Sequence, residues 1–362
     1  MISITHKCLD LLENLIDLEH VQKTRNLQKA AFTFQPVDHI PTVINYDVSP
    51  DEWPIYGFDE IYENREKMLL NELRPVYIGA KLQDDRLYGI RANYGTGIIA
   101  SIFGCETRVF DNTLPIGIHV SPEKLAEILE SEEPDINSGI MPRVFETAGY
   151  FRQILSGYPK LSQVIGSQMF DIQGPFDNAS IIWGSDIFYA LYDNPDKVKL
   201  LCSKITNVIL KSAWRLRQID NCPVQEHDGA WNHLGGFCVR LDSCINLSAE
   251  HYTSISKPFD EQLLKAIGGW IHFCGNANQW WKHLLDIPKL KGINPYQGEF
   301  YHLYELYEKC EHAGVPVVQW MVPLDSRCRE RIRTGFSRIV NAKDFNDARR
   351  LKDVLYSSGH AE

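Results

Sequence analysis

The stretch GGWIHFCGNAN, residues 268–278, holds the features from which the fold of this chain is inferred. A run of apolar and aromatic residues ends in a histidine and a cysteine two positions apart, and a glycine follows at once. Successive strand residues face opposite sides, so Trp270, His272 and Cys274 are expected on one face and the two residues between them on the other. The pattern predicts a buried strand whose carboxyl end presents polar side chains.

Similar short apolar runs recur along the chain and are separated by helical patterns. With WIHFCG (270–275), the candidates number eight, and CPVQEH (222–227) is a possible extra strand; the other seven are PTVINY (41–46), PVYIGA (75–80), SQVIGSQMF (162–170), FCVRLD (237–242), GINPY (292–296), VPVVQW (315–320) and SRIVN (337–341). Residues 81–160 are less regular. Strands alternating with helices predict an α/β fold, and eight of them favour a (β/α)8 TIM barrel. A doubly wound open sheet is the alternative, weakened because no strand is followed by GxGxxG.

The length of 362 residues allows one large barrel, and no Gly/Ser-rich or Pro-rich linker divides the chain. We therefore expect an N-terminal helical extension over 1–34 and one barrel over 35–362. A net charge of −10 argues against a nucleic-acid partner. No signal peptide or membrane span is recognised, and nine cysteines without a CxxC pattern are typical of reduced thiols. These features predict a cytoplasmic protein with no membrane partner, and they leave a homodimer open.

In a barrel of this kind the active site lies at the carboxyl ends of the strands. His272 and Cys274 would sit there side by side, at a spacing suited to holding one Zn²⁺ through an imidazole nitrogen and a thiolate. The alternative is structural: Cys274 would be a small buried apolar residue and His272 a hydrogen-bonded core residue. The residues by themselves leave both interpretations open.

Four blocks of sequence resemble the uroporphyrinogen decarboxylase superfamily, in matching order over most of residues 35–355. The blocks are HFCGN (272–276), IQGPFDNASIIWG (172–184), YDNPDKV (192–198) and LDSCINLSAEHYTSISKPFDEQL (241–263). The resemblance implies a single (β/α)8 barrel. It also implies one of two activities, because the superfamily includes porphyrinogen decarboxylases and corrinoid-linked methyltransferases, some of which bind zinc through His-x-Cys and a distant second cysteine.

One departure separates the two branches. The decarboxylases carry an arginine-rich motif after the first strand, whereas this chain has no arginine from 41 to 64. The methyltransferase branch is therefore closer, and the resemblance to it implies zinc-assisted transfer of a methyl group between a small methylated substrate and a corrinoid (cobalamin). The chain has no DxHxxG pattern, so the corrinoid would be carried by a partner protein. A decarboxylase of a small carboxylic acid and a non-catalytic ligand-binding barrel are the alternatives.

The third zinc ligand has no clear match, because no cysteine follows residue 341. Cys328, Glu226 and His227 are the candidates, in that order.

Other site residues are nominated by their positions at strand ends. Asp242 ends the strand 237–242 and could accept a proton or support His272, and Asp84 and Asp85 are further catalytic candidates. Tyr94, Asn294 and Tyr296 are candidates for binding substrate; the alternative for the tyrosines is simple packing, and for the two adjacent aspartates it is a solvated loop.

Overall fold

Six parallel strands form the main sheet of the computed structural model, which describes residues 3–220, 227–228, 230–235 and 237–357. They lie in the order β1-β12-β11-β10-β9-β8. Their bounds are β1 Thr42–Asn45, β8 Cys238–Arg240, β9 Gly269–Phe273, β10 Leu290–Pro295, β11 Val317–Trp320 and β12 Phe336–Asn341.

Two further parallel strands, β2 (Tyr88–Ile90) and β5 (Ile165–Ser167), pair with each other. Backbone contacts join them to both edges of the main sheet. Asp85 N donates to Thr42 O at 3.3 Å beside β1, and Gln173 forms a parallel bridge with Arg240 of β8. The arrangement is therefore barrel-like. Two small antiparallel pairs form separate sheets, β3 (Glu106–Arg108) with β4 (Ile116–Ile118), and β6 (His227–Asp228) with β7 (Trp231–Asn232).

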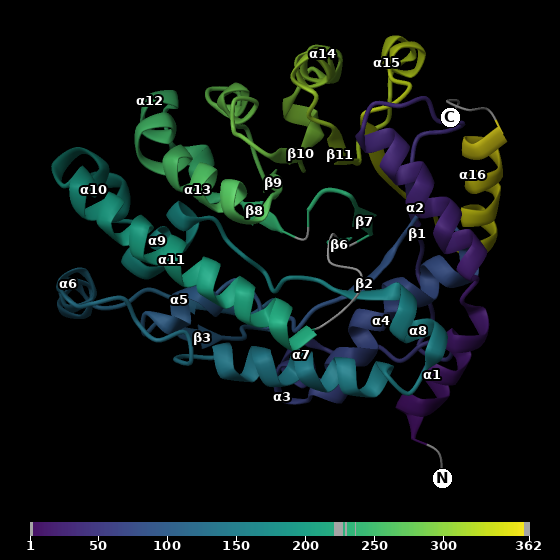
Figure 1. The fold of residues 1–362 in the computed structure, drawn as a ribbon, viewed down its shortest axis with the longest axis horizontal. Coiled ribbons are helices and arrows are strands. Elements are labelled where there is room, and N and C mark those ends of the chain that lie inside the picture. Colours follow the sequence, from purple (N-terminus) through teal and green to yellow (C-terminus); the bar gives the residue numbers. More distant parts are fainter. Residues whose placement is uncertain (1–2, 221–226, 229, 236, 358–362) are drawn as a thin grey trace.

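Helices surround the strands (Figure 1). The first two, α1 (Ile4–Leu15) and α2 (Leu18–Phe32), fall within the expected extension over 1–34. None of the helices in the described ranges is both long and apolar enough to cross a bilayer. The remaining helices are α3 Phe58–Glu63, α4 Arg65–Leu82, α5 Ile98–Ile102, α6 Pro122–Glu130, α7 Met141–Leu155, α8 Pro159–Val164, α9 Pro175–Trp183, α10 Ile187–Asp193, α11 Pro195–Asp220, α12 Ala249–His251, α13 Lys257–Ile267, α14 Leu303–Ala313, α15 Ser326–Arg331 and α16 Phe345–Ser357.

Six of the eight predicted strands are confirmed, namely those of the main sheet. The prediction over 75–80 is wrong, because these residues form the buried end of α4. A short apolar run does not distinguish a strand from the buried face of a helix. Over 162–170 the prediction is half right, since α8 ends at Val164 and β5 takes only three residues. The possible strand 222–227 lies outside the described residues except for His227, which begins β6.

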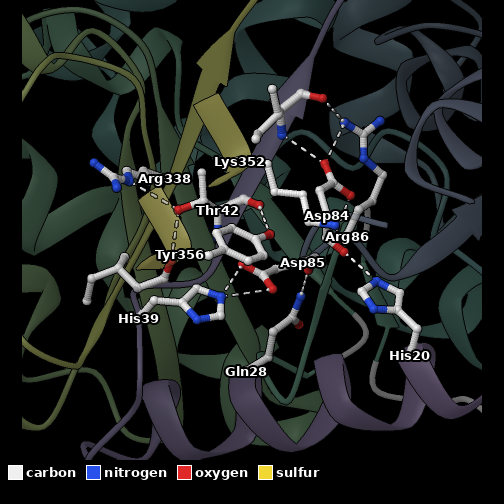
Figure 2. Close-up of polar contacts among 12 residues, drawn as sticks. His20, Gln28, His39, Thr42, Asp84, Asp85, Arg86, Arg338, Lys352 and Tyr356 are labelled. Atoms are coloured by element: carbon white, nitrogen blue, oxygen red, sulfur yellow. Dashed lines mark hydrogen bonds and ion pairs between the residues drawn. The ribbon is translucent and has the colours of Figure 1, made fainter. Parts of the chain in front are cut away.

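Asp84 connects the segment before β2 to β1 (Figure 2). Its Oδ2 accepts a hydrogen bond from the backbone N of Ile44 at 2.8 Å, and its Oδ1 accepts one from the backbone N of Arg86 at 3.1 Å. The Arg86 guanidinium lies 3.5 Å from the same carboxylate. Burial raises the pKa of Asp84, and Arg86 opposes that rise. The carboxylate therefore satisfies two buried backbone donors and one buried cation.

The Asp85 carboxylate also connects the segment before β2 to β1 (Figure 2). Its Oδ2 accepts from the backbone N of Thr42 at 2.9 Å, and His39 Nε2 donates to it at 3.0 Å. The main chain of this pair also holds α2. Gln28 Nε2 donates to Asp85 O at 2.7 Å, and His20 Nε2 donates to Asp84 O at 2.8 Å. This network therefore anchors α2 to the segment before β2, and that segment to β1.

We predict that Asp84→Ala lowers the free energy of unfolding by about 3–5 kcal/mol, because the buried Arg86 guanidinium loses its ionic partner and two buried backbone donors lose their acceptor. Urea unfolding followed by circular dichroism measures the loss. Asp51→Ala, at an exposed position, is the matched control and should change stability by less than about 0.5 kcal/mol. Equal stability of the two variants would contradict this role for Asp84.

Candidate metal centre

β9 presents its polar residue on the inner side of the sheet, as the alternation predicts. Trp270 and His272 line an interior cavity, whereas Ile271 and Phe273 are fully buried in the core cluster on the other side. The chain then turns sharply after Cys274. Gly275 has φ +78°, and a Cβ there would lie 2.7 Å from the Ile245 side chain, so the turn requires glycine.

His272, Cys274 and Asp242 meet at the carboxyl ends of β9 and β8. The His272 Nε2 atom lies 3.4 Å from Cys274 Sγ and 3.6 Å from Asp242 Oδ1. Asp242 Oδ1 also accepts a hydrogen bond from the Cys274 backbone N at 2.8 Å. Among the described residues, this is the one group of three or more His, Cys, Asp or Glu side chains whose ligand atoms all lie within 4.8 Å of one another.

Asn294 fixes the tautomer of His272. The two residues are register partners on β10 and β9, and Asn294 Oδ1 lies 2.6 Å from His272 Nδ1. The amide nitrogen of Asn294 donates to Val318 O at 2.9 Å, so its oxygen must be the atom that faces the imidazole. Nδ1 therefore carries the proton, and the lone pair of Nε2 points toward Cys274 and Asp242. Hydrogen bonding of the second nitrogen in this way is typical of metal-binding histidines.

Burial dominates the electrostatics of the cluster. It lowers the pKa of His272, against the opposing charge of Asp242, so the imidazole is neutral at neutral pH. Burial, together with the adjacent Asp242 carboxylate, raises the pKa of Cys274 to about 12. The thiol is therefore protonated unless a cation is present. A neutral imidazole, a thiol that a cation would ionise and a carboxylate form a donor set that suits Zn²⁺.

The cavity next to the cluster has a volume of about 420 Å³. Two layers of side chains from β8 and β9 form part of its wall: Cys238 and Trp270 lie one layer below Arg240 and His272, which are register partners. The lower layer belongs to a small apolar core cluster. The polar residues of the lining are Asn45, Glu72, Arg86, Arg91, Gln168, Arg240, His272, Tyr296 and Gln319.

Other predicted residues lie at varying distances from this centre. Tyr296 lines the cavity, is 44% exposed, and its ring centroid is 5.6 Å from that of His272. Tyr94 is buried elsewhere, with its hydroxyl 2.8 Å from Thr147 Oγ1, so packing explains it better than substrate binding. Asp84 and Asp85 do not line the cavity, because their carboxylates are engaged by β1.

Of the three predicted third zinc ligands, only the side chain of Cys328 is described, and it lies outside the cluster. Cys328 is buried in α15, where burial raises its pKa to about 11, and it does not belong to the group around His272. Glu226 lies outside the described residues, and for His227 the structure describes only its backbone in β6. Asp242, which the sequence nominated for proton transfer or support, is the third member of the group.

Sequence reasoning missed the arginines of the cavity. Arg240 lies within the predicted strand 237–242, two residues before Asp242, so the same alternation that nominated Asp242 places Arg240 on the inner face. Arg91 follows β2, which was not predicted, and no signal in the irregular region 81–160 pointed to it.

Comparisons with known proteins identify the fold and no family. No family model matches the chain, and no curated protein matches it in sequence. The structure is similar to a methyltransferase from Methanosarcina mazei, with a TM-score of 0.65 and 15% sequence identity, over 93% of this chain and 99% of that chain. At that identity the likeness concerns the fold. It does not show the uroporphyrinogen decarboxylase superfamily specifically.

We predict that His272 carries its proton on Nδ1 at neutral pH. ¹⁵N NMR of protein labelled at its 12 histidines, with His272→Gln for assignment, reports the tautomer. Asn294→Ala should shift His272 to a mixture of tautomers, whereas Asn294→Asp retains an acceptor and should retain Nδ1–H. A wild-type signal with the proton on Nε2 would contradict the assigned hydrogen bond.

Proposed function

We propose that this chain is a methyltransferase that moves a methyl group between a small methylated compound and a corrinoid carried by a partner protein. The observation that carries the proposal is the close group of His272, Cys274 and Asp242 beside an interior cavity. The likeness of the fold to a methyltransferase supports it. The resemblance to the corrinoid-linked branch of the uroporphyrinogen decarboxylase superfamily belongs to the same proposal, as does closure of the eight parallel strands into a (β/α)8 barrel.

His272 Nε2, Cys274 Sγ and Asp242 would hold a zinc ion. A bound zinc lowers the pKa of a coordinated thiol and so supplies a nucleophilic thiolate at neutral pH. Asn294 keeps the lone pair of Nε2 aimed at the cluster, and Asp242 anchors the Cys274 backbone. Three protein ligands leave the fourth position of a tetrahedral site for substrate, as in catalytic zinc sites.

A decarboxylase is the second candidate function, and fewer of its predicted catalytic residues lie at the cavity. Asp84 and Asp85 are each engaged by backbone donors of β1 and lie away from the cavity lining, so of the three aspartates only Asp242 could take part. A non-catalytic barrel is the third candidate. The His272–Asn294 bond argues against it, since a purely structural histidine would not need a free Nε2 turned toward a thiol and a carboxylate.

We predict about one zinc ion per chain in protein purified without chelator, measured by elemental analysis. Cys274→Ser should lose most of this zinc, because a neutral hydroxyl replaces a thiolate. Asp242→Asn should also lose zinc. Asn294→Ala should weaken zinc binding by about 10–100-fold, as expected when the hydrogen-bond partner of a ligand is removed.

Cys328→Ser is the matched control, because it removes a buried thiol outside the cluster. Retention of full zinc by Cys328→Ser and loss by Cys274→Ser supports the assignment. Loss of zinc in both would restore Cys328 as a ligand, and wild-type protein with far less than one zinc per chain would remove the metal from the proposal.

Methyl transfer itself is tested with a methylated corrinoid protein, mixed with the chain and a panel of small acceptors. We predict a change in the cobalamin absorption spectrum as the methyl group leaves cobalt, and loss of that change in Cys274→Ser. An unchanged spectrum with zinc-loaded protein across the panel would overturn the methyltransferase assignment and leave the metal site standing.

A further inference from the structure

The cavity beside the cluster is rich in hydrogen-bond donors. Arg91 and Arg240 both line it and contact the same carboxylate, with Arg91 Nη1 3.4 Å and Arg240 Nε 3.0 Å from Asp171. Their guanidinium groups therefore lie side by side. Arg86 lines the same cavity from the segment before β2. Three cations thus border one cavity whose wall also includes His272.

Two buried donors in the lining have no partner among the described residues. They are Nε of Arg86, a residue only 5% exposed, and Nε1 of the fully buried Trp231. Within the same described ranges, the Arg91 side chain has Asp171 as its one hydrogen-bond partner, although a guanidinium carries five N–H groups. Buried donors are rarely left unpaired, so these point to a ligand that brings acceptors.

The carboxylates at the cavity are already engaged. Glu72, the one carboxylate of the lining, accepts from the backbone N of Arg91 at 3.1 Å and from the Asn93 side chain at 3.0 Å. Asp171 is held by the two arginines and by Gln173 Nε2 at 3.0 Å. An incoming group therefore finds unused donors and few unused acceptors.

The side-chain amide of Gln319 also lines the cavity, and the backbone of this residue is strained. Gln319 has φ +58°, a left-handed conformation that is uncommon for a residue other than glycine, and the register of β11 against β12 shifts around it. Gln319 N donates to Ser337 Oγ at 3.1 Å, which helps to hold the irregularity, and the Gln319 side chain lines the cavity. Strain of this kind is concentrated at ligand sites.

We propose that the cavity binds a small monocarboxylate, with its carboxylate at Arg91 and Arg240 and the rest of the molecule directed toward His272. The inference rests on the proposed function, because it names the chemical class of the methylated substrate that would meet the cluster. A carboxylate matches the planar guanidinium fork and offers acceptors to the N–H groups of Arg91 that Asp171 does not occupy.

The charge of the surrounding side chains and the volume of the cavity restrict the class of ligand further. Asp84, Asp171 and Glu72 already stand beside the three arginines, so a dianion such as phosphate would meet more repulsion than a monoanion. A volume of about 420 Å³ suits a small organic acid and is far too small for a corrinoid, which would have to approach from outside. The carboxylate therefore belongs to the substrate and not to the methyl carrier.

Saturation-transfer NMR titration tests this with straight-chain monocarboxylates from acetate to hexanoate, the matched neutral amides and inorganic phosphate. We expect carboxylates of this series to bind more tightly than their amides and than phosphate. Arg91→Met should weaken carboxylate binding by about 10–100-fold, the effect of losing a charge-assisted contact, and Arg91→Lys by less. Arg350→Met, at a surface position 74% exposed, is the control and should bind as wild type does.

The proposal is overturned if no acid in the series binds, if acids bind no more tightly than their amides, or if phosphate binds more tightly than the acids. Unchanged binding in a folded Arg91→Met variant would also overturn it. Running the titration on chelator-treated protein separates it from the metal site, since Arg91 and Arg240 are not in the metal-binding group. Carboxylate binding without zinc or methyl transfer would overturn the proposed function alone. Zinc and methyl transfer without carboxylate binding would overturn this inference alone.

Discussion

The register of three adjacent parallel strands is the constraint on which the site depends. Arg240, His272 and Asn294 occupy the same level on β8, β9 and β10, so all three side chains emerge on the same face, about 4.8 Å apart from strand to strand. Asn294 can then reach His272 directly. A slip of one residue in either pairing would turn one of these side chains into the helical shell and separate the imidazole from its acceptor.

The strands of the main sheet, and the face on which their side chains lie, could be predicted from the sequence where an apolar run is bounded by polar or turn-forming residues. The alternation in 270–275 correctly placed His272 and Trp270 on the inner face, because the period of a strand is two and requires no tertiary information. The apolar run 75–80 was wrongly predicted as a strand, because it has no alternation and only its apolar composition supported the prediction. Its residues are buried because α4 packs against the sheet, and burial alone produces the same apolar composition in a helix and in a strand.

The aspartates show what sequence position cannot supply. Asp84 and Asp85 stand in a polar segment after an apolar run, as catalytic residues do, yet they bind backbone N–H groups of residues about forty positions earlier. Asp242 joins His272 across thirty positions through strand pairing. Whether such an aspartate has a structural role or lies in the site depends on which strands become neighbours, and the local sequence does not show this. For the same reason Arg91, beyond an unpredicted three-residue strand, had no local signal.

The proposed function depends above all on His272, Cys274 and Asp242 being ligands of one zinc ion. X-ray absorption spectroscopy at the zinc edge tests this most directly, because it resolves sulfur from nitrogen and oxygen in the coordination shell. We predict one sulfur at about 2.3 Å, with the remaining ligands nitrogen or oxygen at about 2.0–2.2 Å. Two sulfur ligands would bring a second cysteine into the site, and a shell with no sulfur would show that Cys274 does not hold the metal.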